Sequence, residues 1–126
     1  MDGGKPTVLV VDDEKDVRDW LRLDFELYGW TVYDAEDGFK ALECWSELHP
    51  DIALLDEMMP GMTGLETARR IRESQPDAHL LMFSASVDKN VRAEAERIGV
   101  QFISKVDHQA LVRYMEALHA ELSAQE

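Results

Sequence analysis

Five short apolar runs alternate with segments of helical periodicity along the whole chain. The runs cover residues 7–11, 31–34, 52–55, 79–83 and 100–104, and the helical segments cover 15–28, 38–48, 64–74, 88–98 and 108–122. This alternation predicts a parallel α/β sheet. The first, third and fourth runs are apolar throughout, which is typical of central strands covered on both faces, whereas the second is more polar and predicts an edge strand.

Capping residues support the boundaries of these segments. Thr63 begins a capping box, and Asp88 and Asp107 are expected to be N-caps of the fourth and fifth helices. Gly29 and Gly99 follow the first and fourth helices, where a left-handed residue is favoured. We find no internal repeat or linker, so we expect one domain over residues 1–126 with a core of about 6–122.

Charge and composition exclude several classes of function. The chain has 13 Lys and Arg against 26 Asp and Glu, a net charge of −13, which disfavours direct binding to nucleic acid or to anionic membranes. No apolar run approaches the roughly 20 residues of a membrane span, and the first residues lack the apolar segment of a signal peptide. The single Cys44 excludes an internal disulfide and agrees with a reducing compartment. We therefore expect a cytoplasmic protein.

Polar residues stand at the end of four of the five apolar runs. The first run ends in Asp12 and Asp13, the third in Asp56, the fourth in Ser84 and the fifth in Lys105. Because the carboxyl ends of parallel strands share one edge of a sheet, these side chains are expected to converge. Three carboxylates in a partly desolvated pocket need a counter-ion, and Mg²⁺ (or Mn²⁺) suits oxygen ligands of this kind.

The pattern indicates phosphoryl chemistry with a division of roles. Asp56 stands alone and is the candidate nucleophile for an acyl phosphate. Ser84 can donate a hydrogen bond to one phosphoryl oxygen and Lys105 can pair with another. The four histidines show no metal-ligand spacing and none is a persuasive phosphodonor, so the donor must come from another protein.

Four sequence stretches resemble the receiver domains of two-component response regulators. These are residues 8–14 (VLVVDDE), 56–66 (DEMMPGMTGLE), 84–85 (SA) and 102–105 (FISK). The resemblance covers essentially the whole chain. It implies a flavodoxin-like α/β fold: a five-stranded parallel sheet of strand order 2-1-3-4-5 with helices on both faces.

The resemblance also implies how such a chain works. Asp56 would take a phosphoryl group from the phosphohistidine of a sensor histidine kinase or a histidine phosphotransfer protein. Asp13, Asp56 and the Met58 backbone carbonyl would hold Mg²⁺, with Asp12 acting through water. Ser84 and Phe102 would be the switch residues that remodel the surface of the fourth helix, fifth strand and fifth helix.

In that reading the chain is a phospho-acceptor rather than an enzyme, although it catalyses its own phosphorylation and slow dephosphorylation. It would act on a downstream effector protein or on an output domain missing from this sequence. Because the region of the fourth and fifth helices lacks a dense charged pattern, we expect a monomer or weak dimer.

Two positions depart from the family pattern. Val106 follows Lys105 where the family usually has a proline joined by a cis bond. A cis bond before a residue other than proline costs about 2.5–4 kcal/mol, so we expect either a trans loop, which could shift Lys105, or a strained cis bond. The second position is Met58, whose apolar side chain we expect to hinder the hydrolytic water and lengthen the acyl-phosphate lifetime.

Three other classes of protein share part of this pattern. A phosphatase of the haloacid dehalogenase type needs a second aspartate two residues after its nucleophile, where this chain has Met58. A flavin binder needs hydroxyls and free backbone donors after the first strand, where the chain has Asp12, Asp13 and Glu14. A pseudo-receiver, an interaction module that is never phosphorylated, remains the alternative function.

The first helix contains a conflict between its apolar and polar positions. Its apolar residues cover a wide arc of the helix, and Asp24 falls near the middle of that arc. Either Asp24 lies at the edge of the core with its carboxylate in solvent, or Trp20, Leu23 and Leu27 form a second apolar face that binds a partner helix.

Overall fold

The computed structural model describes residues 4–85 and 88–125, and it contains every predicted strand and helix. The strands are β1 (Thr7–Val11), β2 (Thr31–Ala35), β3 (Ile52–Leu55), β4 (His79–Ser84) and β5 (Gln101–Ser104). The helices are α1 (Lys15–Leu27), α2 (Gly38–Leu48), α3 (Gly64–Ser74), α4 (Lys89–Arg97) and α5 (His108–Ser123). Each boundary lies within one residue of its predicted position.

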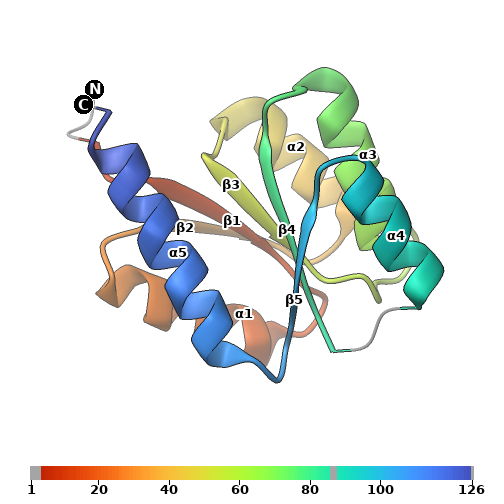
Figure 1. The fold of residues 1–126 in the computed structure, drawn as a ribbon, viewed down its shortest axis with the longest axis horizontal. Helices are drawn as coiled ribbons and strands as arrows, with labels where there is room; N and C mark the ends of the chain where they lie inside the picture. The colour runs from red at the N-terminus through yellow and green to blue at the C-terminus, as the bar shows by residue number, and fades with distance from the viewer. Residues whose placement is uncertain (1–3, 86–87, 126) are drawn as a thin grey trace.

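The five strands form one parallel sheet of order β2-β1-β3-β4-β5 (Figure 1). Helices α1 and α5 cover one face of this sheet, and α2, α3 and α4 cover the other (Figure 1). The predicted flavodoxin-like α/β fold, its strand order and the edge position of β2 are therefore confirmed.

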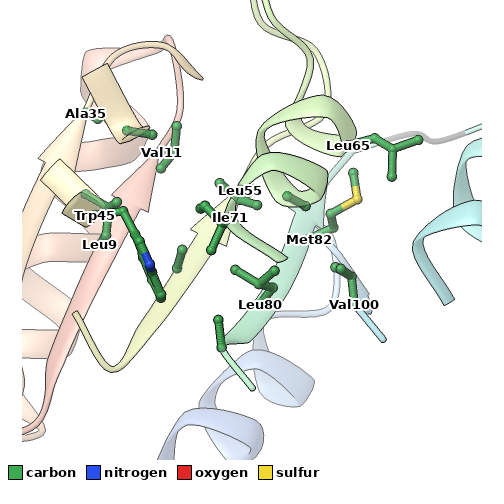
Figure 2. Close-up of a cluster of buried hydrophobic side chains, with 14 of the residues drawn as sticks. Leu9, Val11, Ala35, Trp45, Leu55, Leu65, Ile71, Leu80, Met82 and Val100 are labelled. Atoms are coloured by element: carbon green, nitrogen blue, oxygen red, sulfur yellow. The ribbon is translucent and has the colours of Figure 1, made fainter. Parts of the chain in front are cut away.

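Alternate residues of the strands supply two separate cores, as the two-residue period of a strand requires. Leu9 and Val11 of β1 face α2, where they lie in one cluster with the Trp45 ring (Figure 2). Val8 and Val10 face the opposite cluster, which is built on the side of α1 and α5. Each face of the sheet is thus buried, which leaves the strand ends as the place where polar side chains can gather.

The predicted caps hold the helices at the observed boundaries. Thr63 Oγ1 accepts a hydrogen bond from the Glu66 N–H at 3.1 Å, and the Asp107 carboxylate accepts one from the Ala110 N–H at 3.1 Å. Asp88 likewise caps α4 through the N–H two residues later. Only half of the expected capping box forms, because the Glu66 carboxylate instead accepts hydrogen bonds from arginines of its own helix.

Glycines follow α1 and α4 at the predicted positions. Gly29 has a φ of 92° and Gly99 a φ of 79°, which is the left-handed region that a residue with a side chain rarely adopts. Within the described residues, no helix is long and apolar enough to cross a membrane.

Candidate functional site

Four neighbouring strands bring the predicted site residues to one edge of the sheet. The register pairs Val11 of β1 with Leu55 of β3, so the residues that follow them, Asp12 and Asp56, lie side by side. On the other side of β3, Ser84 ends β4 and its carbonyl oxygen accepts a hydrogen bond from the Lys105 N–H at 3.0 Å. The expected convergence of these strand ends is present in the structure.

The side chains of this edge are in direct contact. Ser84 Oγ donates a hydrogen bond to Asp56 Oδ1 at 3.0 Å. Lys105 Nζ lies 2.8 Å from Asp12 Oδ2 and 3.6 Å from Asp56 Oδ2. Asp12, Asp13 and Asp56 each offer one carboxylate oxygen, and these oxygens lie within 4.8 Å of one another. Three carboxylates, one of which is the candidate nucleophile Asp56, therefore share one site with a hydroxyl and an ammonium.

The charges of the site are only partly balanced by the protein. Asp12 and Asp56 are buried, whereas Asp13 is exposed. Burial raises the pKa of Asp56, and the neighbouring Asp12 charge raises it further; Lys105, Ser84 and a backbone hydrogen bond from Met58 act in the opposite direction. One ammonium facing three carboxylates leaves an excess of negative charge, which fits a divalent cation.

Lys105 is held in its charged form. Burial lowers the pKa of its ammonium, but the hydrogen bond and charge of Asp12, together with the charge of Asp56, outweigh burial and raise that pKa above its ordinary value. The cation that the sequence predicts at the end of β5 is therefore present beside the two buried carboxylates.

The sequence allowed either a trans loop or a strained cis bond after Lys105, and the structure has the trans loop. The Lys105–Val106 peptide bond is trans, and the Val106 N–H lies 3.3 Å from Ser104 Oγ. Lys105 still reaches both buried carboxylates, and α5 begins at His108 as predicted. The absence of proline has therefore displaced neither the ammonium nor the helix.

The β3–α3 loop carries two structural features that sequence reasoning missed. Glu57 is buried, and its Oε1 accepts a hydrogen bond from the Leu65 N–H at 2.8 Å at the start of α3. Gly64 lies so close to the strand end that a Cβ there would stand 2.2 Å from the Asp56 carbonyl oxygen. Glu57 and Gly64 thus tie the first turn of α3 to the residue that carries the candidate nucleophile.

Arg18 is a further missed residue, and it positions the acidic pair. Its Nη1 donates a hydrogen bond to the Asp12 carbonyl oxygen at 2.8 Å, and its Nε donates one to Asp34 Oδ2 at 3.0 Å. Asp34 is the second-last residue of β2, on the outer side of β1, so this contact could only have been found from the strand order.

The remaining predicted residues lie around this site and on β5. The Met58 side chain is 71% exposed, directly after the buried Asp56 and Glu57. Phe102 of β5 is half-buried against the cluster on the side of α2, α3 and α4, and the guanidinium carbon of Arg92 lies 4.6 Å from its ring centroid. The Phe102 side chain therefore lies between β5 and α4, where a switch residue of this surface would have to be.

Comparisons with known proteins agree with this geometry. The family model of the response regulator receiver domain matches residues 8–116. The response regulator MprA of Mycobacterium ulcerans is 42% identical over 78 residues, which cover 62% of this chain and 34% of MprA. The chain thus spans about a third of the length of this curated relative.

Solved structures of similar sequence have the same fold. A two-component response regulator of the LuxR family from Aurantimonas sp. SI85-9A1 has a TM-score of 0.84 and 30% identity, covering 94% of this chain and 87% of that one. The response regulator TrrA of Thermotoga maritima, in complex with Mg²⁺ and BeF, has a TM-score of 0.80 and 27% identity, covering 90% and 98%. By sequence, fold and the residues gathered at its strand ends, the chain belongs to the response regulator receiver domain family.

Proposed function

We propose that this receiver domain accepts a phosphoryl group on Asp56 within a two-component or phosphorelay system. The observation that carries the proposal is the surroundings of Asp56, a buried carboxylate in contact with both an ammonium and a hydroxyl. An Asp56 carboxylate oxygen forms a bond to the phosphorus of a phosphohistidine as the phosphorus–nitrogen bond breaks. The imidazole leaves with the bonding electron pair and takes up a proton.

Two side chains stabilise the charge of the transferred group. Lys105 pairs with one phosphoryl oxygen, because its ammonium already lies beside both buried carboxylates. Ser84 donates its hydroxyl to a second phosphoryl oxygen and gives up its present hydrogen bond to Asp56. The exchange of this hydrogen bond is the local event that starts the switch.

The acidic residues fit a magnesium ion, with Mn²⁺ as a substitute. Asp13, Asp56 and the Met58 backbone carbonyl would hold it, and Asp12 would act through water because its two oxygens already contact Lys105 and the Glu14 N–H. When bound, such an ion supplies positive charge that neutralises phosphoryl oxygens. The Mg²⁺ in the TrrA complex supports this assignment.

The signal leaves the domain through the surface of α4, β5 and α5. Movement of Ser84 at the end of β4 is passed to Phe102 on the neighbouring β5, which pairs in register with Met82 of β4 and lies under Arg92 of α4. Phe102 then turns inward and α4 repositions. The phosphodonor is a sensor histidine kinase or histidine phosphotransfer protein. The downstream target of the signal is an effector protein or an output domain.

Intact mass spectrometry after incubation with acetyl phosphate and Mg²⁺ tests the proposal. The wild-type chain is expected to gain one phosphoryl group that hydroxylamine removes, as it removes acyl phosphates but not phosphoserine. Asp56→Asn gains none, whereas Asp77→Asn, a matched change at an exposed carboxylate away from the site, gains one as the wild type does. If the wild type gains nothing, the chain is a pseudo-receiver that works as an interaction module.

A further inference from the structure

A cavity of about 200 Å³ lies between α1 and α5, and none of its lining residues belongs to the phospho-acceptor site. Its apolar wall is largely aromatic and includes Phe25 of α1, Tyr28 directly after α1, Trp30 directly before β2 and Met115 of α5. Trp30 and Phe25 are buried, while Tyr28 is nearly half exposed. An engineered apolar cavity of about 150 Å³ binds benzene, so this one can hold an aromatic ring with a short chain.

The polar part of the lining is acidic. Asp24 and Glu116 line the cavity, and none of the described lining residues is a lysine or an arginine. Asp24 is paired through one oxygen with His108 Nε2 at 3.1 Å. The Glu116 carboxylate has no hydrogen bond or ion pair to any residue within 4–85 and 88–125. Glu116 is exposed at the mouth of the cavity, and a carboxylate without a protein partner beside aromatic rings attracts cations rather than anions.

The third polar lining residue, His119, is engaged elsewhere. Its Nε2 lies 3.2 Å from the Gly29 carbonyl oxygen and its Nδ1 lies 3.5 Å from Ser123 Oγ. Its ring packs against Trp30 with a centroid distance of 5.5 Å in an edge arrangement. His119 therefore serves as part of the cavity wall, and its ring nitrogens do not compete for the Glu116 carboxylate.

The cavity wall also contains an unsatisfied donor. Trp30 Nε1 is buried and, within the described part of the chain, has no hydrogen-bond partner. An organic ammonium carries no acceptor for this hydrogen, so the Trp30 indole serves as a reporter of binding and not as a group that holds the ligand. The other buried tryptophan, Trp45, donates its Nε1 hydrogen to Gln75 Oε1 at 3.1 Å, so the two indoles differ in this respect.

We propose that the cavity between α1 and α5 is a binding site for a small organic ammonium that carries an aromatic or alkyl group. The apolar group occupies the aromatic wall, and the ammonium lies at the mouth beside Glu116 and Asp24. The net charge of −13 raises the local concentration of such cations further. This site is separate from the phospho-acceptor site and does not depend on phosphorylation.

Titration of the ¹⁵N-labelled full chain with phenethylammonium tests the site. The Trp30 indole N–H signal is expected to move progressively, with a Kd of about 0.1–10 mM for a ligand of roughly ten heavy atoms. The Trp45 indole signal stays in place, because that side chain lies on the other face of the sheet. The neutral analogue 2-phenylethanol, of similar shape, binds at least about threefold more weakly.

Two charge variants of α5 make the test specific. Glu116→Gln weakens phenethylammonium binding about two- to fivefold and leaves 2-phenylethanol unchanged. Glu121→Gln removes the same charge from a residue outside the cavity lining and changes neither ligand. The proposal is overturned if the Trp30 signal does not move, if the ammonium and the alcohol bind equally well, or if both variants bind the ammonium with the same affinity.

Discussion

Three aspartates of the same site differ in what surrounds each one. Asp12 is buried, and its oxygens contact Lys105 and the Glu14 N–H. Asp56 is buried too, but it shares Lys105 and accepts a hydrogen bond from the hydroxyl of Ser84. Asp13 is exposed and has no hydrogen bond or ion pair to the described residues. Their surroundings therefore suit three roles: an anchor, a nucleophile and an open metal ligand.

Met58 is expected to set the lifetime of the acyl phosphate. It lies two residues after Asp56, within the β3–α3 loop, and its exposed side chain can exclude the water that hydrolyses the phosphoryl bond. Met58→Asn should speed the loss of phosphate from the isolated, phosphorylated chain by about two- to tenfold, which is a change of up to about 1.4 kcal/mol in the barrier. Intact mass spectrometry over time measures the rate.

The control for this prediction is Met58→Leu, which keeps the side chain apolar and of similar size. It should lose phosphate at close to the wild-type rate. Equal rates for Met58→Asn and the wild type would show that the side chain does not control access of water.

The residues of the site could be predicted from sequence because each ends a strand or directly follows one. Asp12, Asp56, Ser84 and Lys105 needed only the rule that parallel strands end at a common edge. Glu57 could not be assigned in this way, because its partner is a backbone N–H eight residues later in α3. Side chains that position the site act through tertiary contacts, and a local pattern contains no signal for them.

At the scale of elements, α1 presents the second apolar face that its sequence allowed. Trp20 is 43% exposed, Leu23 68% and Leu27 83%, and they recur on one side of the helix. Asp24 does not interrupt this face as a free charge, because its carboxylate is paired with His108 of α5. Asp24 thus lies at the edge of the core, but its carboxylate is paired and largely shielded from solvent rather than free in it. The apolar face is exposed, and its binding of a partner helix stays a prediction.

Leu23→Glu tests whether this face binds the helix of a phosphodonor protein. A charge placed in an apolar interface should slow phosphotransfer from the cognate donor at least about fivefold. Phosphorylation by acetyl phosphate needs no protein interface and should stay unchanged. Both rates are measured by intact mass of the receiver over time.

Leu48→Glu is the matched control, because Leu48 is 43% exposed on α2, on the opposite side of the sheet. It should leave both rates unchanged. If Leu23→Glu accepts phosphate from the donor as fast as the wild type, the donor docks elsewhere.

Helices α3 and α4 are joined by an ion-pair cluster whose strength depends on pH. Glu94 of α4 pairs with Arg97 of its own helix and with Arg69 of α3. Its hydrogen bond with Arg97, assisted by Arg69, lowers the pKa of Glu94 to about 2. The stability that this depressed pKa contributes is present above the ordinary value of 4.5 and is lost as the pH falls toward about 2.

Glu94→Gln should therefore unfold at a lower urea concentration than the wild type at neutral pH, with the difference shrinking steadily as the pH falls below 4.5. Glu96→Gln, at an exposed residue of the same helix whose carboxylate has no ion pair with the described residues, should show no such pH dependence. A difference between Glu94→Gln and wild type that is constant with pH would exclude this ion pair as its cause.

The boundaries of the strands and helices were predictable to within one residue, because a two-residue period and a helical period alternate clearly along the chain. Capping residues then fixed the ends of the helices, as Asp107 does for α5. The strand order depended on the family resemblance, because periodicity shows which runs are strands but not which of them pair. The trans form of the Lys105–Val106 bond was likewise one of two open possibilities until the structure was known.

At the scale of the whole molecule, the net charge of −13 opposes compaction through self-repulsion. The repulsion is strongest where acidic residues are forced together, at the ends of β1 and β3. Monovalent salt screens the whole surface, whereas a divalent cation held by Asp12, Asp13 and Asp56 would act at this one site. These two effects can be separated by comparing salts at equal ionic strength.

Mg²⁺ should raise the melting temperature of the wild-type chain above its value in NaCl at the same ionic strength, because binding to the folded state alone adds about 2.7 kcal/mol at a hundredfold excess over the Kd. Asp13→Asn removes the exposed carboxylate of the cluster, so it should melt higher than the wild type in NaCl, through relief of repulsion, and gain little from Mg²⁺. Asp16→Asn, an exposed change on α1 outside the cluster, should keep the full Mg²⁺ effect. Differential scanning calorimetry measures all three chains, and equal melting temperatures of the wild type in the two salts would mean that the acidic cluster does not hold the ion.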